Sequence, residues 1–183
     1  MSVPEMHRRE APKHFKCAVL TVSTSKAKKA GEKKREGKNA RPADIGDLSG
    51  EIALKLLSES GHEVVLYDVL PDERERIREA VERALSSDAE VVFTTGGTGL
   101  ASSDVTIEVV AEMLEKHIPG FGEIFRLKSY ENVGTAAILS RAIAGVVAGK
   151  VIFCLPGSPS AVELALKEII LKELPHIMKH VRE

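Results

Sequence analysis

Short apolar runs rich in β-branched residues are the feature that most constrains the fold of this chain. They cover residues 16–23, 89–97 and 150–157 and read KCAVLTVS, AEVVFTTGG and KVIFCLPG. Runs of this length, apolar at successive rather than alternate positions, are typical of strands buried on both faces of a sheet. The sequence therefore predicts a sheet that is covered by helices on both sides.

Segments with helical periodicity separate these runs, as in 72–87, where apolar residues recur at i, i+3, i+4, i+7 and i+8. A further strand is expected over 62–72, and apolar runs on either side of Ala148 and Gly149 predict a hairpin. Together these patterns predict a three-layer α/β sandwich whose sheet is mostly parallel, with one antiparallel strand. The remaining helices are expected over 47–61, 105–117, 121–133 and 161–174.

The length of 183 residues suits one domain, predicted over 15–183 after a flexible N-terminal lead over 1–14. A net charge of −1 and an aromatic content of 4% disfavour a nucleic-acid or anionic-membrane partner. The chain has no signal-peptide core and no apolar run of about 18 residues, so we expect a soluble cytoplasmic protein. Cys17 and Cys154 lack metal-ligand spacing and are predicted to be small buried side chains.

The basic stretch over 26–41 contains no large apolar side chain. It cannot offset its ordering entropy by burial, and we therefore expect a mobile surface loop.

In α/β sheets of this kind ligands bind beyond the carboxyl ends of the strands. This rule selects the loops STSK (23–26), TTGGTG (94–99) and LPGSPS (155–160). A glycine-rich loop between a strand and a helix can bind phosphate through exposed N–H groups, although it can also be a plain turn. LPGSPS repeats this pattern, and its alternative is a proline turn with a serine N-cap. Neither the P-loop nor the dinucleotide-binding glycine pattern is present.

Two aspartates, Asp47 in DLSG and Asp104 in SSDVT, fall near these loops. Either could simply cap the helix that follows it. Because Mg²⁺ is usually held by one or two carboxylates together with phosphate oxygens, the pair also indicates a magnesium–nucleotide site.

The ordered motifs DLSG, TTGGTG, SSDVT, GFGEIFR, AILSR and LPGSPSAV resemble those of the MoaB/Mog family of molybdenum cofactor biosynthesis proteins. The resemblance extends from about Phe15 to the end of the chain and looks closest to the MoaB branch. It implies a molybdopterin-binding fold and, in the active members, Mg²⁺-dependent transfer of AMP from ATP to molybdopterin with release of pyrophosphate. It also implies a homo-oligomer, either a trimer or a hexamer.

By the same resemblance, Asp47 and Asp104 are the functional acids and candidate Mg²⁺ ligands. The residues expected to bind nucleotide or pterin lie in the three motif loops: Ser49, Gly50, Thr95, Gly96, Gly97, Thr98, Gly99, Pro156, Gly157 and Ser158. Where this chain has LASS (100–103), several adenylyltransferase members carry proline and arginine. The basic stretch over 26–41 could replace that positive charge, or it could be a solvated loop without a role.

Two other functions are compatible with these motifs. One is a non-catalytic protein that binds molybdopterin or an assembly partner. The other is a nucleotide-processing hydrolase, as among the related competence/damage-inducible proteins.

Overall fold

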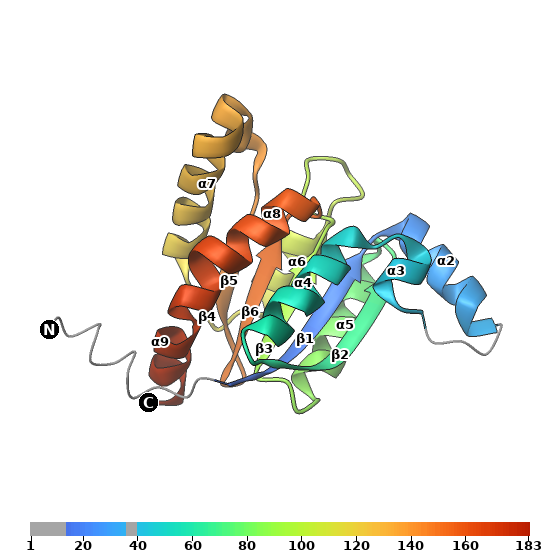
Figure 1. Ribbon diagram of the computed structural model, residues 1–183, viewed down its shortest axis with the longest axis horizontal. Helices are drawn as coiled ribbons and strands as arrows, with labels where there is room; N and C mark the ends of the chain where they lie inside the picture. Colours follow the sequence, from blue (N-terminus) through green and yellow to red (C-terminus); the bar gives the residue numbers. More distant parts are fainter. Residues whose placement is uncertain (1–13, 36–39) are drawn as a thin grey trace, which may run out of the picture.

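A six-stranded sheet runs through the middle of the computed structural model, which describes residues 14–35 and 40–183 (Figure 1). Its strand order is β2-β1-β3-β6-β5-β4. The predicted flexible lead lies outside the described residues except for its last residue. The strands are β1 (Lys16–Val22), β2 (Glu63–Leu70), β3 (Val91–Thr95), β4 (Lys116–His117), β5 (Ile143–Val147) and β6 (Lys150–Leu155).

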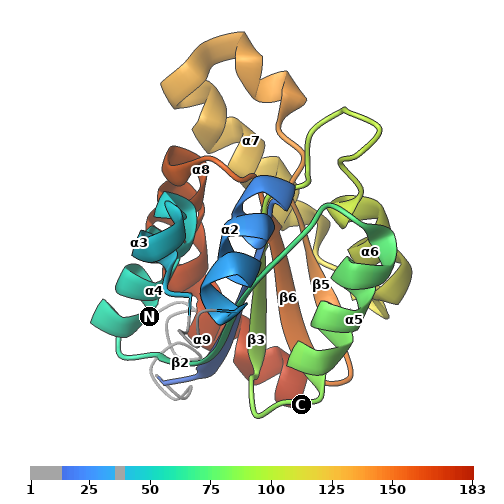
Figure 2. The ribbon, with the colours of Figure 1, turned by 90° about the vertical axis from the view of Figure 1, so that its right-hand side faces the viewer.

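Helices cover both faces of this sheet, as the sequence predicted (Figure 2). They are α2 (Thr24–Arg35), α3 (Pro42–Ile45), α4 (Leu48–Glu59), α5 (Arg74–Leu85), α6 (Thr106–Met113), α7 (Pro119–Val133), α8 (Pro159–Leu164) and α9 (Leu171–Arg182). A 3-10 segment, η1 (Gly134–Leu139), follows α7, and a π-helical segment, η2 (Ala165–Ile170), joins α8 to α9.

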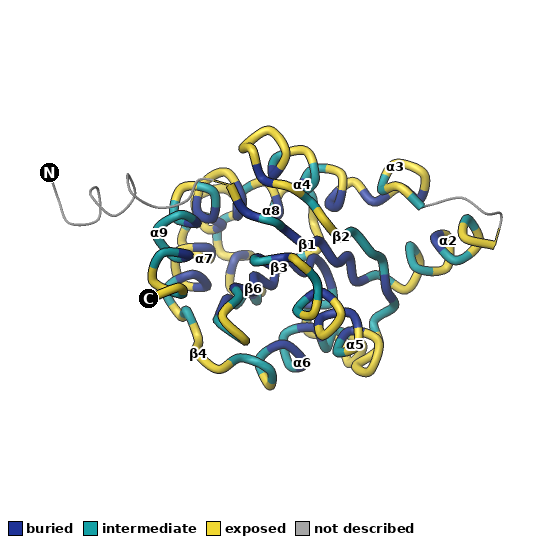
Figure 3. Tube along the Cα trace, turned by 90° about the horizontal axis from the view of Figure 1, so that it is seen from below, coloured by how far each residue is buried: buried dark blue, intermediate teal, exposed yellow. Residues whose placement is uncertain are grey.

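Alternating side chains of the central strands divide the core into two apolar clusters. In β1, Cys17 and Val19 pack with α4, α8 and α9, whereas Ala18 and Leu20 pack with α5 and α6. Because successive residues of a strand point to opposite faces, side chains on both faces are buried: β3 is buried throughout, and β1 and β6 are buried at every position after the first (Figure 3). The three-layer sandwich is therefore confirmed.

The predicted hairpin is also confirmed: β5 and β6 pair antiparallel across Ala148 and Gly149. β5 pairs antiparallel with β4 as well, whereas β2, β1, β3 and β6 are mutually parallel. The helix predicted over 105–117 was too long, because α6 ends at Met113 and β4 pairs with Val146 and Gly145 of β5. A Cβ on Gly145 would lie 2.5 Å from the carbonyl oxygen of Lys116, so this pairing requires glycine.

The prediction of a mobile loop over 26–41 was wrong for most of its described part. Residues 24–35 form helix α2, which lies beside β2 at the edge of the sheet (Figure 1). Ala30 is buried there, and the Lys34 ammonium lies 3.4 Å from the Asp68 carboxylate on β2. Lysine, glutamate and alanine are good helix formers, and a few contacts with β2 suffice to order them. Residues 36–39 lie outside the described range.

Both cysteines are buried without a disulfide, as expected. Burial raises the pKa of the Cys17 and Cys154 thiols to about 12, so neither is a thiolate at neutral pH. Within the described part of the chain, no helix combines the length and the apolar character needed to cross a membrane.

The helical state of α2 can be tested at Gly31, where an added Cβ would meet no atom within 4 Å. Since alanine is favoured over glycine inside a helix by about 0.5–1 kcal/mol, Gly31→Ala is expected to slow tryptic cleavage within 24–35 about two- to fivefold. Cleavage is measured by mass spectrometry of peptides released during brief digestion. Gly31→Pro should accelerate it, and equal rates in all three proteins would show that the segment is a loop.

Candidate functional site

The three motif loops meet at the carboxyl edge of the parallel strands. The Ser49 hydroxyl at the start of α4 donates a hydrogen bond of 2.7 Å to the Gly157 carbonyl after β6. The Gly96 N–H donates to the Leu155 carbonyl at 3.0 Å, and a Cβ on Gly157 would lie 3.0 Å from the Gly96 Cα. The loops DLSG, TTGGTG and LPGSPS therefore form one continuous surface, as the carboxyl-edge rule predicted.

The glycines of TTGGTG are required by backbone conformation and by close packing. Gly96 and Gly97 have φ values of 97° and 63°. A Cβ on Gly96 would lie 2.3 Å from the Val22 carbonyl oxygen, and one on Gly97 would lie 2.3 Å from the Thr106 Oγ1. Only glycine fits both constraints, so the loop is tightly packed against β1 and α6.

The next backbone groups of this loop face no internal acceptor. Within residues 14–35 and 40–183, no atom accepts a hydrogen bond from the N–H groups of Gly97, Thr98 or Gly99. Consecutive N–H groups without internal partners in a glycine-rich turn form a concavity suited to an anion. Thr95, in contrast, is buried at the end of β3, and its hydroxyl donates to the Thr21 hydroxyl at 3.4 Å.

Asp47 is the buried acid of the site, with a solvent exposure of 0%. Its Oδ2 accepts hydrogen bonds from the Thr21 hydroxyl at 2.6 Å and from the Tyr67 hydroxyl at 2.8 Å, while its Oδ1 pairs with the Lys26 ammonium at 2.8 Å. A Cβ on Gly50 would lie 2.2 Å from Oδ2, so the glycine of DLSG makes room for the carboxylate. Asp47 precedes α4, but its side chain makes no cap hydrogen bond.

These contacts determine the ionisation of Asp47. Burial alone raises the pKa of a carboxyl group, but the hydrogen bonds from Lys26, Thr21 and Tyr67 outweigh burial and hold the Asp47 pKa below its ordinary value. Burial and the neighbouring Asp47 carboxylate raise the pKa of Tyr67. At neutral pH Asp47 is therefore an anion and Tyr67 a neutral hydrogen-bond donor.

Asp104 is the more accessible acid. The alternative that it caps α6 is wrong, because Val105 occupies the N-cap position and the Asp104 Oδ2 instead accepts a hydrogen bond from the Ala101 N–H at 3.0 Å. This bond closes a turn over 101–104 and places the carboxylate above Gly99, where a Cβ would lie 2.6 Å from Oδ2. Asp104 and Asp47 share no hydrogen-bond partner within the described residues.

Next to the surface formed by the three motif loops, a crevice lies between α7 and α8. A hollow of about 210 Å³ contains Pro156 and Ser158 of LPGSPS together with Phe125 and Ser140. Ser158 is the N-cap of α8 and accepts a hydrogen bond from the Ala161 N–H at 3.3 Å, so the predicted serine cap is confirmed.

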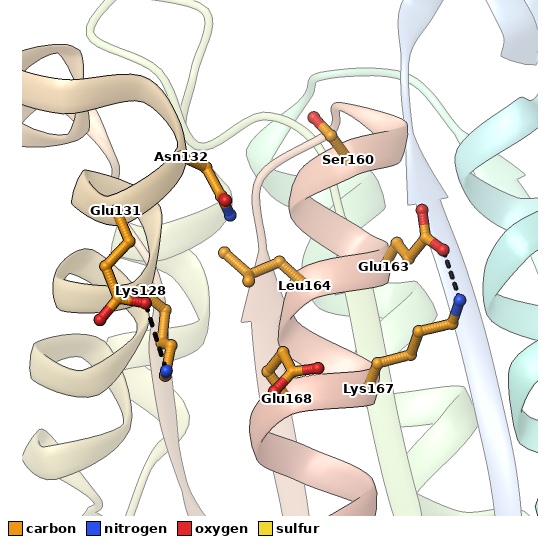
Figure 4. A pocket seen from close by; sticks show the side chains of 8 residues that line it. All are labelled: Lys128, Glu131, Asn132, Ser160, Glu163, Leu164, Lys167 and Glu168. Carbon is orange, nitrogen blue, oxygen red and sulfur yellow. Dashed lines mark hydrogen bonds and ion pairs between the residues drawn. The ribbon is translucent and has the colours of Figure 1, made fainter.

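This hollow continues into a wider groove of about 460 Å³ between the same helices (Figure 4). Asn132 of α7 and Leu164 of α8 point toward each other across it (Figure 4). Its charged side chains pair along the surface, where Lys128 lies 3.2 Å from Glu131 and Lys167 lies 2.5 Å from Glu163. Among the described residues, no charged side chain lines the inner hollow beside LPGSPS, so it is more apolar than the wider groove.

A family model described as "Probable molybdopterin binding domain" (MoCF_biosynth) matches residues 18–176. The chain belongs to this family. It is 42% identical to "Molybdenum cofactor biosynthesis protein B" of Bacillus cereus over 97% of this chain and 96% of that protein. It is 44% identical to "Molybdopterin adenylyltransferase" of Pyrococcus furiosus over 98% of both chains.

Solved structures agree with the MoCF_biosynth assignment. "Tungsten cofactor synthesizing protein MoaB" from Pyrococcus furiosus superposes with a TM-score of 0.80 at 42% identity, covering 94% of this chain and all of that one. The resemblance noted in the sequence is thereby confirmed.

Sequence reasoning missed two residues of this MoCF_biosynth chain whose side chains hold the segments around the candidate site. Arg141, in AILSR, donates from Nε to the Thr98 carbonyl at 2.9 Å and from Nη1 to Glu108 at 2.5 Å, and it also reaches the Asp104 carbonyl at 3.4 Å. It therefore holds both ends of the loop that contains Asp104. Its hydrogen bond to Glu108 lowers the pKa of that carboxyl group.

Asp72 is the other missed residue. Its Oδ2 accepts hydrogen bonds from both the N–H and the hydroxyl of Thr24, each 2.8 Å long, and so ties the start of α2 to the end of β2. Arg141 is the last residue of the motif AILSR and Asp72 the last of the predicted strand over 62–72, but their partners are distant in sequence, so no local pattern could have identified these bonds.

The donor chemistry of the two aspartates fits Mg²⁺. No group of three or more His, Cys, Asp or Glu side chains in the described segments could hold a metal ion. A site of one or two carboxylates completed by phosphate oxygens is nevertheless the usual arrangement for this ion. Asp104 makes one side-chain hydrogen bond and Asp47 makes three, one of them to an ammonium group.

The pH dependence of stability tests the Asp47 network. Because the folded-state pKa of Asp47 is below its ordinary value of 3.8, its contribution is complete above that pH and is lost as the pH falls through the lower, folded-state pKa. Asp47→Asn should lower the free energy of unfolding at pH 7 by about 1–3 kcal/mol, since the amide leaves Lys26 without a carboxylate. The difference from the wild type should shrink below pH 3.8.

Urea unfolding followed by circular dichroism at fixed protein concentration measures this difference. Asp88→Asn is a matched control, because Asp88 is exposed at the opposite end of the sheet and its pair with Lys16 is screened by solvent. A difference for Asp47→Asn that stays constant from pH 7 to pH 3 would contradict the assignment.

Proposed function

We propose that this chain transfers AMP from Mg-ATP to molybdopterin in molybdenum cofactor biosynthesis. The observation that carries the proposal is the N–H concavity of Gly97, Thr98 and Gly99, flanked by the acids Asp47 and Asp104 at one sheet edge. The proposal is also supported by a relative named molybdopterin adenylyltransferase, to which the chain is 44% identical over 98% of both sequences.

In this reaction an oxygen of the terminal phosphate of molybdopterin attacks the α-phosphorus of ATP. A new P–O bond forms, the bond between the α-phosphorus and the bridging oxygen breaks, and pyrophosphate leaves with that electron pair. Such a displacement requires two anions to be held in line, so catalysis consists mainly of positioning and charge stabilisation. Mg²⁺, when bound, would supply positive charge to the phosphates.

In the proposal, different residues of the chain bind the nucleotide, the metal and the pterin. The N–H groups of Gly97–Gly99 bind nucleotide phosphates, with Gly96 and Thr95 supporting the loop from beneath. Asp104 and Asp47 orient the metal. The hollow that contains Pro156 and Ser158 accepts the pterin, since its wall is partly apolar and lined with hydroxyl groups. Ser49, Gly50 and Gly157 keep the two halves of the crevice in contact.

The exposed loop LASS favours one alternative, a non-catalytic protein that binds molybdopterin. Leu100 is 70% exposed, and the loop carries no positive charge for a phosphorylated pterin. A cytoplasmic location is part of the main proposal, because the reaction consumes ATP and the two buried thiols require no oxidising compartment.

Pyrophosphate release from Mg-ATP tests the function. Pterin-dependent release is expected, and Asp104→Asn should lower its rate on the order of 100-fold, because the lost charge acts on the transferring group. Asp88→Asn, the same change at the far end of the sheet, should leave the rate unchanged. Absence of release would favour the non-catalytic binder, and release without pterin would indicate a nucleotide hydrolase.

We further propose that the chain is a homo-oligomer, a trimer or a hexamer, assembled through α7 and η1. These two segments carry six of the nine exposed large apolar side chains in the described residues, and a concentration of this kind usually marks a contact surface. The six side chains of this face are Ile124, Leu127, Tyr130, Val133, Ile138 and Leu139.

A charge placed in this face should dissociate the oligomer. Leu127→Glu combined with Ile138→Asp is expected to reduce the mass in size-exclusion chromatography with light scattering to that of one chain, because both side chains are at least 60% exposed in the single chain. Val65→Glu replaces an exposed apolar residue on β2, near the other edge of the sheet, and should leave the mass unchanged. An unchanged mass in the double variant would place the interface elsewhere.

A further inference from the structure

Lys26 is the only charged partner of the buried Asp47 carboxylate in the described structure. Thr21 and Tyr67 both donate to Oδ2 from strands β1 and β2, whose positions the sheet determines. Lys26 binds the other oxygen, Oδ1, at 2.8 Å. A metal ion that replaces one of these partners would therefore bind Oδ1, the oxygen that the Lys26 ammonium group covers.

The backbone of Lys26 is held in place, whereas its ammonium group can move. Asp72 binds the N–H and hydroxyl of Thr24, and the Ser23 N–H donates to the Leu70 carbonyl at 2.8 Å, so the first turn of α2 stays at the carboxyl edge. The Lys26 side chain is 24% exposed, and its four-carbon stem lets the ammonium group leave Asp47 without moving the helix.

A metal ion bound to Oδ1 would repel the ammonium group on the same oxygen, because like charges a few ångströms apart repel strongly in a partly buried site. When the metal of a metal–nucleotide complex binds the Asp47 carboxylate, the Lys26 ammonium group loses its partner. The phosphate oxygens of the same complex then lie beside the ammonium group. A compact ammonium group on a flexible stem is a common ligand for phosphate.

We propose that Lys26 binds Asp47 in the nucleotide-free protein and moves to a phosphate oxygen of the nucleotide when the metal–nucleotide complex binds. The proposal rests on the proposed function only in requiring a nucleotide in this crevice. It gives α2 a role: the helix brings one lysine to the site, while Lys28 and Lys29 of the same helix are exposed to solvent. It also gives the buried Asp47 carboxylate a cationic partner before any metal binds.

Calorimetric binding of an α,β-methylene analogue of ATP with Mg²⁺ tests this exchange without any turnover. Lys26→Met should weaken binding of the analogue about 10-fold or more, since a charge-assisted hydrogen bond is lost. Lys28→Met removes the same charge from the same helix and should bind like the wild type. Lys26→Arg should largely restore binding, because it keeps a cationic donor.

Two further ligands separate phosphate binding from a merely structural role. Adenosine, which has no phosphate, should bind Lys26→Met and wild type equally, whereas a disturbed site would weaken both ligands. Mn²⁺ alone, followed by electron paramagnetic resonance, should bind Lys26→Met more tightly than wild type, because the competing ammonium group is gone. Equal analogue affinities in Lys26→Met and Lys28→Met, or a parallel loss of adenosine binding, would overturn the proposal.

The test also separates this proposal from the proposed function. If analogue binding depends on Lys26 but the protein shows no pterin-dependent pyrophosphate release, the proposed adenylyl transfer is contradicted. The proposed movement of Lys26 is then still supported. A wild-type protein that binds no analogue would overturn both.

Discussion

The neutralisation of one buried carboxylate is the constraint on which the site depends. An ionised group at zero exposure costs several kcal/mol unless its oxygens are hydrogen-bonded and its charge is paired. Asp47 meets this requirement with donors from three elements: Thr21 on β1, Tyr67 on β2 and Lys26 on α2. The pairing of β1 with β2 and the position of α2 are therefore coupled to the charge state of a single side chain.

The loops around Asp47 are closely packed, and glycines make this packing possible. Gly50 leaves room for the carboxylate, and Gly96 lets TTGGTG cross the end of β1 in contact with the Val22 carbonyl. Ser49 and Gly157 then join the first loop to the third. Because a glycine or a backbone group takes part in each of these contacts, the way in which these loops meet depends largely on backbone positions. Such a frame is suited to positioning two phosphorylated substrates.

Sequence patterns predicted the parts of the molecule that are determined by residues close together in the chain. Every strand except β4, the hairpin at Ala148 and Gly149 and the meeting of the motif loops followed from apolar periodicity and from the carboxyl-edge rule. Helix α2 was missed because it lacks apolar periodicity and is held by partners distant in sequence, among them Asp68, Asp72 and Asp47. Arg141 was missed for the same reason, since its acceptors lie 33 to 43 positions away.

The anchoring of the Asp104 loop limits what the side chains of LASS can change at the candidate site. Arg141 holds Thr98 and the Asp104 carbonyl, so the loop is anchored before and after residues 100–103, and only that tip projects into solvent. The Asp104 carboxylate takes its position from the Ala101 N–H, a backbone donor that any residue except proline supplies at 101. Side chains at the tip therefore change the charge at the mouth of the crevice, while the backbone and Arg141 determine where the acid lies.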